Sequence, residues 1–213
     1  MRLAVYGTRP DGHANVVLDL FGGSPDHEFV GLLDDWPENA DRMIGGLAVI
    51  GGSGDLAELA RGGLDGVVLG FGAAVGRGRI LAAIEAAGLA LPTLVHPTAF
   101  VAGSATLGNG TQVMPQASVG PNVRVGRGVL VNTGATLDHD VEVADASVID
   151  PGAVLTGRVQ IGSEVEIGSG AVLIPDSVVG DGATVGAGAV VVRPVEAGVT
   201  VVGVPARPLT LSG

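Results

Sequence analysis

The sequence predicts two joined folds, a small α/β domain followed by a left-handed parallel β-helix, and three observations carry this prediction. Strand-like and helix-like segments alternate over residues 1–95. From Val101 onward, an aliphatic residue recurs at every sixth position. Only 3% of the 213 residues are aromatic whereas 37 are glycine, so the core must consist of aliphatic side chains between frequent tight turns.

The segment 1–95 is typical of a partial Rossmann-like domain. Apolar segments indicate strands at residues 3–7, 29–35, 65–71 and 93–95, and periodic segments indicate helices that begin near residues 13, 53 and 79. This alternation predicts a parallel sheet covered by helices.

The segment 96–213 follows a period of six. The aliphatic position recurs sixteen times between residues 101 and 191, and the residue four positions later is always Ala, Val, Ser or Thr. On a strand, that small residue and the next aliphatic residue point inward together, and turn-forming pairs such as Asn109-Gly110 lie between the strands. Such self-similarity is the signature of hexapeptide repeats. With three repeats to each triangular coil, the segment predicts a little over five coils.

One face of the predicted β-helix is apolar. Residues 18 positions apart stack on neighbouring coils, which creates an aliphatic ladder on an otherwise polar surface. The members of this ladder are Val154, Val172, Ile174, Val190 and Val192. An apolar strip on a polar surface indicates a buried interface, so we expect a homotrimer. Coverage of the strip by the N-terminal domain or by the C-terminal tail is the alternative.

Composition excludes several classes of function. The formal charge of −11 argues against a nucleic-acid partner, which would require clustered Lys and Arg. The sequence has no cysteine, and this rules out a thiolate metal site and a cysteine nucleophile. The N-terminal residues lack a signal-peptide pattern and no apolar run is long enough to span a membrane, so we expect a cytoplasmic protein without membrane contact.

Of the four histidines, His139 is the candidate for catalysis. It lies in the segment LDHDVE, two residues after an inward-facing leucine, and therefore at a corner beside the apolar ladder. Histidine is the usual general base near neutral pH, and Asp138 and Asp140 lie close enough to orient it. A solvated polar corner explains the same residues equally well.

A second candidate site lies at the carboxyl edge of the predicted sheet. His13 follows Gly12 at the start of the first helix, and Asp34 and Asp35 end the second strand. Ligands of open α/β sheets bind at this edge, and the carboxylates could accept hydrogen bonds from a ribose or a base. An ordinary turn is the alternative for the two aspartates. His27 and His96 are expected to be structural.

Several segments together resemble the hexapeptide-repeat acyltransferases of the sialic acid O-acetyltransferase and nucleotide-amino-sugar N-acetyltransferase group, which includes enzymes of bacillosamine and perosamine pathways. These segments are the Gly-His turn, the strand end LLDD, the junction LVHPTAFV, the repeat NTGATLDHD and the terminal VVGVPAR. Two features differ from the group: the loop GTRPDGH is about two residues longer, and Val148 stands where many members carry histidine.

The resemblance implies roles for particular residues. It implies that His139 is the general base for the acceptor and that Asp140 orients it. By the same resemblance, a nucleotide-sugar binds near Gly12, His13, Asp34, Asp35 and Gly72. Acetyl-CoA then lies between adjacent β-helices, in a pocket that includes Val148, Gly157, Ser169 and Ala187, and the backbone N–H near Gly157 serves as the oxyanion donor.

These arguments predict an acetyl-CoA-dependent N-acetyltransferase that acts on a nucleotide-linked amino sugar and needs no metal. Acetylation of a sugar hydroxyl, as on a sialic acid, is the nearest alternative. A non-catalytic trimeric scaffold that binds a nucleotide is the alternative from another class of protein.

Overall fold

The computed structural model describes residues 1–8 and 12–209, which form two compact units. Within the described residues, the first unit comprises the range from Met1 to Gly72 and Arg79–Pro92, and the second comprises Ala73–Gly78 and the chain from Thr93 onward. None of the helices in the described ranges is long and apolar enough to cross a membrane.

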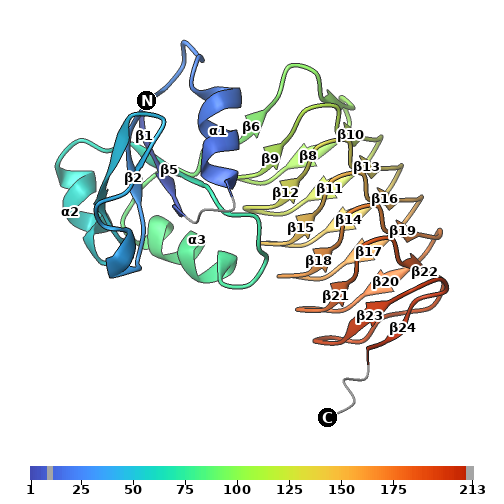
Figure 1. Cartoon of the computed structure of the whole chain (residues 1–213). Coiled ribbons are helices and arrows are strands. Elements are labelled where there is room, and N and C mark those ends of the chain that lie inside the picture. Colours follow the sequence, from blue (N-terminus) through green and yellow to red (C-terminus); the bar gives the residue numbers. More distant parts are fainter. Residues whose placement is uncertain (9–11, 210–213) are drawn as a thin grey trace. The chain divides into compact units, whose positions relative to one another are not determined.

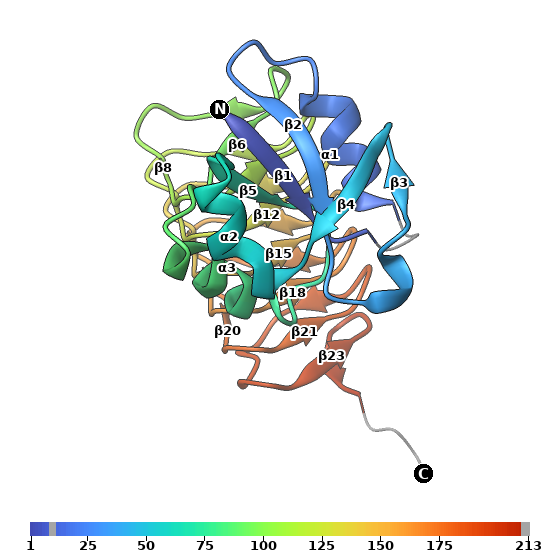
Figure 2. The same ribbon diagram turned by 90° about the vertical axis from the view of Figure 1, so that its left-hand side faces the viewer.

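The first unit is built on a five-stranded sheet in the order β3-β4-β2-β1-β5 (Figure 2). All neighbouring strands are parallel except β3 and β4, which form a hairpin. The strands are β1 Arg2–Tyr6, β2 Glu28–Leu33, β3 Met43–Ile44, β4 Leu47–Gly51 and β5 Gly66–Leu69. The helices are α1 His13–Phe21, η1 Pro37–Asn39, η2 Ser53–Asp55, α2 Leu56–Arg61 and α3 Arg77–Ala86, of which α3 belongs to this unit from Arg79 onward.

The core of this unit follows from the apolar pattern. The interior strand β1 buries Leu3, Ala4 and Val5 completely, as expected for a strand covered on both faces. Helix α1 buries the side chains of Ala14, Val17 and Phe21. The predicted partial Rossmann-like domain is therefore observed, with its strand ends on one edge of the sheet.

The hairpin β3–β4 was not predicted from the sequence. Its turn consists of Gly45 and Gly46, both with positive φ (59° and 82°). Two consecutive residues in this conformation form the tight turn that suits the twist of antiparallel strands, and glycine adopts it without steric cost. The Gly-Gly pair was the sequence signal for the hairpin.

The second unit is a left-handed parallel β-helix whose stacked coils (Figure 1) form three sheets, one on each face. From β6 to β22, each strand pairs in parallel with the strand 18 residues away, as in Thr136↔Val154, whereas β23 pairs with β21 at a spacing of 16 residues and β24 is antiparallel to β23. The first sheet contains β7 Phe100–Val101, β10 Ser118–Val119, β13 Thr136–Leu137, β16 Val154–Leu155, β19 Val172–Leu173 and β22 Val190–Val191. The second contains β8 Thr106–Leu107, β11 Arg124–Val125, β14 Glu142–Val143, β17 Gln160–Ile161 and β20 Val178–Val179. The third contains β6 Leu94–Val95, β9 Gln112–Val113, β12 Leu130–Val131, β15 Val148–Ile149, β18 Glu166–Ile167, β21 Thr184–Val185, β23 Thr200–Val202 and β24 Arg207–Pro208.

The corners of the coils are sharp because one residue at each corner has left-handed backbone geometry. Between Gly110 and Gly188, every sixth residue has a positive φ. Half of these positions hold glycine, and the others hold residues such as Asn122 and Asp140. The interior is a continuous column of buried Val, Leu, Ile and Ala, as the repeat predicts.

The assignment of residues 93–95 to the N-terminal sheet was wrong. Strand β6 pairs with β9 of the β-helix, with Val95 opposite Val113. The physical reason is that Val95 lies six residues before Val101 and has a small residue, Ala99, four positions later. The hexapeptide rule therefore extends one repeat further toward the N-terminus.

Candidate active site

His139 lies at the corner that follows β13, where two aspartates hold its main chain and its ring. The Asp138 carboxylate accepts a hydrogen bond from the backbone N–H of His139 at 2.8 Å. The ring Nδ1 lies 2.8 Å from Oδ2 of Asp140. Because a carboxylate can only accept, Nδ1 carries the proton and Nε2 carries the lone pair. The His139 side chain is about half exposed, so Nε2 is available to accept a proton from a ligand.

Asp140 is itself held in place. It adopts a left-handed φ of 59°, and its Oδ1 accepts a hydrogen bond from Nδ2 of Asn122 at 3.0 Å. Hydrogen bonds from His139 and Asn122 lower the pKa of Asp140 below its usual range. The carboxylate therefore stays ionised and directs its second oxygen to the imidazole.

Gly157 occupies the same corner one coil further along, against the ring of His139. A Cβ at this position would lie 2.6 Å from both Cε1 and Nε2 of His139, so only glycine leaves room for the imidazole. Within residues 1–8 and 12–209, no group accepts the backbone N–H of Gly157. A proton acceptor and a free N–H donor therefore lie side by side.

The other predicted cofactor residues are not gathered at this corner within one chain. Gly157 follows strand β16, whereas Ser169 precedes β19 of the same sheet, so they lie at opposite edges of that sheet. Ala187 stacks on Ser169, and both residues are exposed. Val148 lies on β15 in the third sheet and is fully buried.

The aliphatic ladder lies on the sheet between these two edges, as predicted. Val154, Val172 and Val190 pair successively on β16, β19 and β22. Ile174 and Val192 are 40% and 38% exposed, which is unusual for aliphatic side chains that form a continuous strip.

At the second candidate site, the structure places Asp34 directly after β2. Its Oδ2 accepts hydrogen bonds from the backbone N–H and the hydroxyl of Thr8, at 2.8 and 2.6 Å. Arg42 donates from Nη1 to the backbone oxygen of Thr8 at 2.9 Å. Burial alone would raise the pKa of Asp34, but the hydrogen bonds from Thr8 and Trp36 outweigh it and lower the pKa. Asp34 thus ties the loop after β1 to the end of β2.

Asp35 joins two further segments. Its carboxylate accepts hydrogen bonds from the backbone N–H and hydroxyl of Ser53, at 2.7 and 3.0 Å. Nη2 of Arg79 lies 3.3 Å from its Oδ2. Thr8, Arg42, Ser53 and Arg79 were not singled out in the sequence, since no spacing rule links them to the aspartates.

The remaining substrate candidates lie at the same carboxyl edge of the sheet. Gly12 has a φ of 90° and caps α1, and His13 begins that helix. Gly72 follows β5, and a Cβ there would meet no other atom within 4 Å. Residues 9–11 of the loop GTRPDGH, whose length differs from the resembled group, lie outside the described residues.

The two other histidines hold turns. His96 lies 2.9 Å from Oγ1 of Thr98 through its Nδ1. His27 contacts the backbone oxygen of Phe21 through Nε2 at 3.0 Å and packs edge-on against Phe29. Among the residues that the structure describes, no group of three or more His, Asp or Glu side chains could hold a metal ion.

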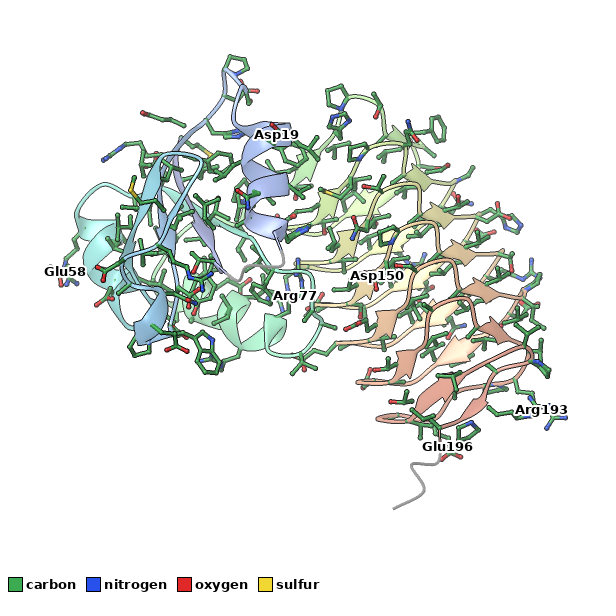
Figure 3. All side chains as sticks on the ribbon, in the orientation of Figure 1. Asp19, Glu58, Arg77, Asp150, Arg193 and Glu196 are labelled. Atoms are coloured by element: carbon green, nitrogen blue, oxygen red, sulfur yellow. The ribbon has the colours of Figure 1, made fainter. Side chains whose placement is uncertain are left out.

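A further titratable group, Asp150, was not predicted. It lies on the outside of the β-helix after β15 (Figure 3). Burial and the nearby charge of Glu166 raise its pKa to about 6, against the effect of a hydrogen bond from Asn132. Asn132 lies 18 residues before Asp150, so the stacking rule could have identified the pair.

Comparison with known proteins places this geometry in a family. Residues 158–193 match the family model described as bacterial transferase hexapeptide (six repeats). The acetyltransferase domain of PglB from Neisseria gonorrhoeae, solved in complex with acetyl-CoA, is 38% identical, with a TM-score of 0.88 over 98% of each chain. The chain belongs to the nucleotide-amino-sugar N-acetyltransferase group of hexapeptide-repeat acyltransferases.

Two further solved structures are similar to this chain over nearly its whole length. PerB from Caulobacter crescentus, solved with CoA and GDP-perosamine, is 30% identical, with a TM-score of 0.89 over 99% of this chain and 98% of PerB. WeeI from Acinetobacter baumannii is 26% identical, with a TM-score of 0.82 over 98% of this chain and all of WeeI. A search of curated protein sequences returned no significant match.

Proposed function

We propose that this acetyltransferase transfers the acetyl group of acetyl-CoA to the amine of a nucleotide-linked amino sugar, with His139 as the general base. The observation that carries the proposal is the corner at which Nε2 of His139 and the N–H of Gly157 lie side by side, with Asp140 fixing the tautomer. The family relationship and the ligands of PglB and PerB support the choice of substrates.

The residues at this corner have complementary roles in such a transfer. Acetyl-CoA, when bound, supplies a thioester carbonyl. Nε2 of His139 accepts a proton from the amine as it attacks that carbonyl, and the N–H of Gly157 donates to the oxygen as it gains charge. Asp140 stabilises the imidazolium, and His139 then returns its proton to the leaving sulfur.

A trimer is part of the proposal. Gly157 lies at one edge of the sheet that carries the ladder, and Ser169 and Ala187 lie at the other edge. A cofactor that contacts both edges must therefore lie in a groove between two copies, which burial of the ladder would create.

The nucleotide-sugar is proposed to bind at the edge formed by Gly12, His13, Asp34, Asp35 and Gly72. Because acetyl-CoA and nucleotide-sugars are cytoplasmic metabolites, we place the enzyme in the cytoplasm.

The test is acetyl-CoA turnover with a panel of acceptors. GDP-perosamine and UDP- or dTDP-linked amino sugars are compared with the matching hydroxyl sugars and with a sialic acid, while release of free thiol is followed. We expect thiol release and a mass increase of one acetyl group only with amino sugars. Thiol release with the hydroxyl sugars alone would contradict N-acetylation. Binding of a nucleotide-sugar without thiol release, for every acceptor tested, would indicate a non-catalytic scaffold.

A further inference from the structure

Asp140 belongs to a column of polar corner residues that stack along the β-helix. Residues 18 apart occupy the same corner of successive coils, as the strand register shows. The column consists of Ser104, Asn122, Asp140, Arg158 and Asp176. Three of its members, Asn122, Arg158 and Asp176, share the left-handed backbone of Asp140, with φ of 60°, 63° and 63°.

Within this column, Asn122 contacts Asp140 on the side away from the histidine. Its Nδ2 donates to Oδ1 of Asp140 at 3.0 Å, whereas Oδ2 of Asp140 faces Nδ1 of His139 at 2.8 Å. The Asn122 backbone is anchored in turn, because Oγ of Ser104 accepts its N–H at 3.0 Å. The two carboxylate oxygens of Asp140 thus have separate partners.

The cation on the other side of Asp140 is directed elsewhere. Arg158 forms a two-point ion pair with Asp176, with Nε to Oδ1 at 2.7 Å and Nη2 to Oδ2 at 2.9 Å. This pairing keeps the guanidinium from competing with His139 for the Asp140 carboxylate. Among the described residues, the only side-chain hydrogen bond to Oδ1 of Asp140 comes from Asn122.

We propose that Asn122 is a positioning residue that fixes the rotation of the Asp140 carboxylate and thereby the ring of His139. This inference rests on the proposed function of His139 and Asp140. A carboxylate held by one oxygen can rotate about its Cβ–Cγ bond, because such a torsion is broad. A second hydrogen bond to the other oxygen restricts that rotation and keeps Oδ2 in line with Nδ1.

The test is the substitution Asn122→Gly, because glycine keeps the left-handed corner without strain and removes only the side-chain donor. With acetyl-CoA and the best amino-sugar acceptor of the panel, we expect kcat to fall about 3- to 10-fold, as for loss of one hydrogen bond. The KM for acetyl-CoA should not change, since the side-chain hydrogen bond that the substitution removes runs to Asp140. Asn122→Asp preserves the shape but replaces the donor with an acceptor, and it should slow turnover at least as much.

Gln116→Gly is the matched control. Gln116 has a φ of 61° in the preceding corner, and a hydroxyl 18 residues earlier, that of Thr98, accepts its N–H at 3.2 Å. The described structure shows no contact from its side chain to His139 or Asp140. The control should keep kcat within about twofold of wild type, so an equal loss in both variants would overturn the proposal by showing a general effect of glycine at a corner.

A double-mutant cycle with Asp140→Asn separates positioning from other roles. If Asn122 acts through Asp140, Asn122→Gly should change kcat less than about twofold once Asp140 has been replaced. An undiminished loss in that background would overturn the proposal. If Asp140→Asn alone leaves kcat unchanged, the proposed function of the pair fails. If Asp140→Asn lowers kcat but the single variant Asn122→Gly keeps the wild-type kcat, only the role of Asn122 is refuted.

Discussion

At the scale of single residues, the contact between Gly157 and His139 requires glycine at position 157. We predict that Gly157→Ala lowers kcat by about 10-fold or more, because the new methyl would overlap Nε2 and push the ring off Asp140. Turnover with the best amino-sugar acceptor measures the effect, and circular dichroism checks that the fold is retained.

Gly103→Ala is the control for this substitution. Gly103 occupies the same corner three coils earlier, and a Cβ there would meet no atom within 4 Å. It should retain wild-type turnover. If Gly157→Ala is as active as Gly103→Ala, the imidazole of His139 does not act as the general base in the observed position.

Asp150 gives a prediction about pH and stability. Its folded pKa of about 6 exceeds the usual value of a carboxyl group, so ionisation is disfavoured in the folded protein. Asp150 therefore does not change the free energy of unfolding below about pH 4, and it lowers the free energy of unfolding progressively as the pH rises toward 6. Asp150→Asn should raise the free energy of unfolding by about 1 kcal/mol at pH 8, after allowance for solvent screening, and by much less at pH 4.5.

Thermal melts of wild type and Asp150→Asn at both pH values provide the measurement. Asp41→Asn, at an exposed turn of the first unit, is the control and should show no such difference between pH 4.5 and pH 8. A stabilisation by Asp150→Asn that is equal at both pH values would contradict this account.

At the scale of elements, a tryptophan at the carboxyl edge of the first unit can report ligand binding there by its fluorescence. Trp36 is the only tryptophan of the chain, is 63% exposed and directly follows Asp35. We predict that a saturating nucleotide-sugar, but not acetyl-CoA, changes its fluorescence, because a base bound at this edge alters the surroundings of the indole. At 100 times its Kd, the same ligand should stabilise the fold by about 2.7 kcal/mol.

Trp36→Phe separates the probe from the site. It should abolish the fluorescence change and keep the thermal stabilisation. Stabilisation of the wild type without any change in emission would place the nucleotide away from this edge.

The elements show where sequence reasoning succeeds. The hexapeptide positions determine nearly every strand of the β-helix, because each coil needs an inward aliphatic residue at a fixed spacing. Strand β6 fell outside the counted repeats because the count began at Val101, although Val95 and Ala99 already fit the hexapeptide rule. The hairpin β3–β4 was missed although Gly45-Gly46 marked its turn.

The candidate site was less predictable than the fold. The sequence spacing placed His139 and Asp140 at a corner. The contact with Asn122 was not predicted, although stacking by 18 residues could have identified it. The network of Asp34 and Asp35 could not be derived, because Thr8, Ser53 and Arg79 approach only through the packing of separate βα units. Their side chains obey no common period.

At the scale of the whole molecule, the ladder predicts an oligomer. We expect light scattering to report three times the chain mass of 21.0 kDa. Val172→Asp should dissociate the trimer, because an unpaired charge in an apolar interface is costly and symmetry repeats it in every copy.

Val178→Asp is the matched control for the ladder. Val178 begins strand β20 on the second sheet and is 40% exposed. Its substitution should leave the trimer intact. A wild-type chain that is monomeric at micromolar concentration would contradict the assembly and the groove between copies.

The most direct test of the central claim is the turnover of His139→Ala. A positioned general base contributes about 10²–10⁴-fold to rate, or about 3–5 kcal/mol of barrier. His139→Ala should lose that much of kcat while it stays trimeric and binds acetyl-CoA as wild type does, and Asp140→Asn should lose less because it only orients the ring. A His139→Ala enzyme that retains more than about a tenth of wild-type turnover would contradict the role of His139 as the base.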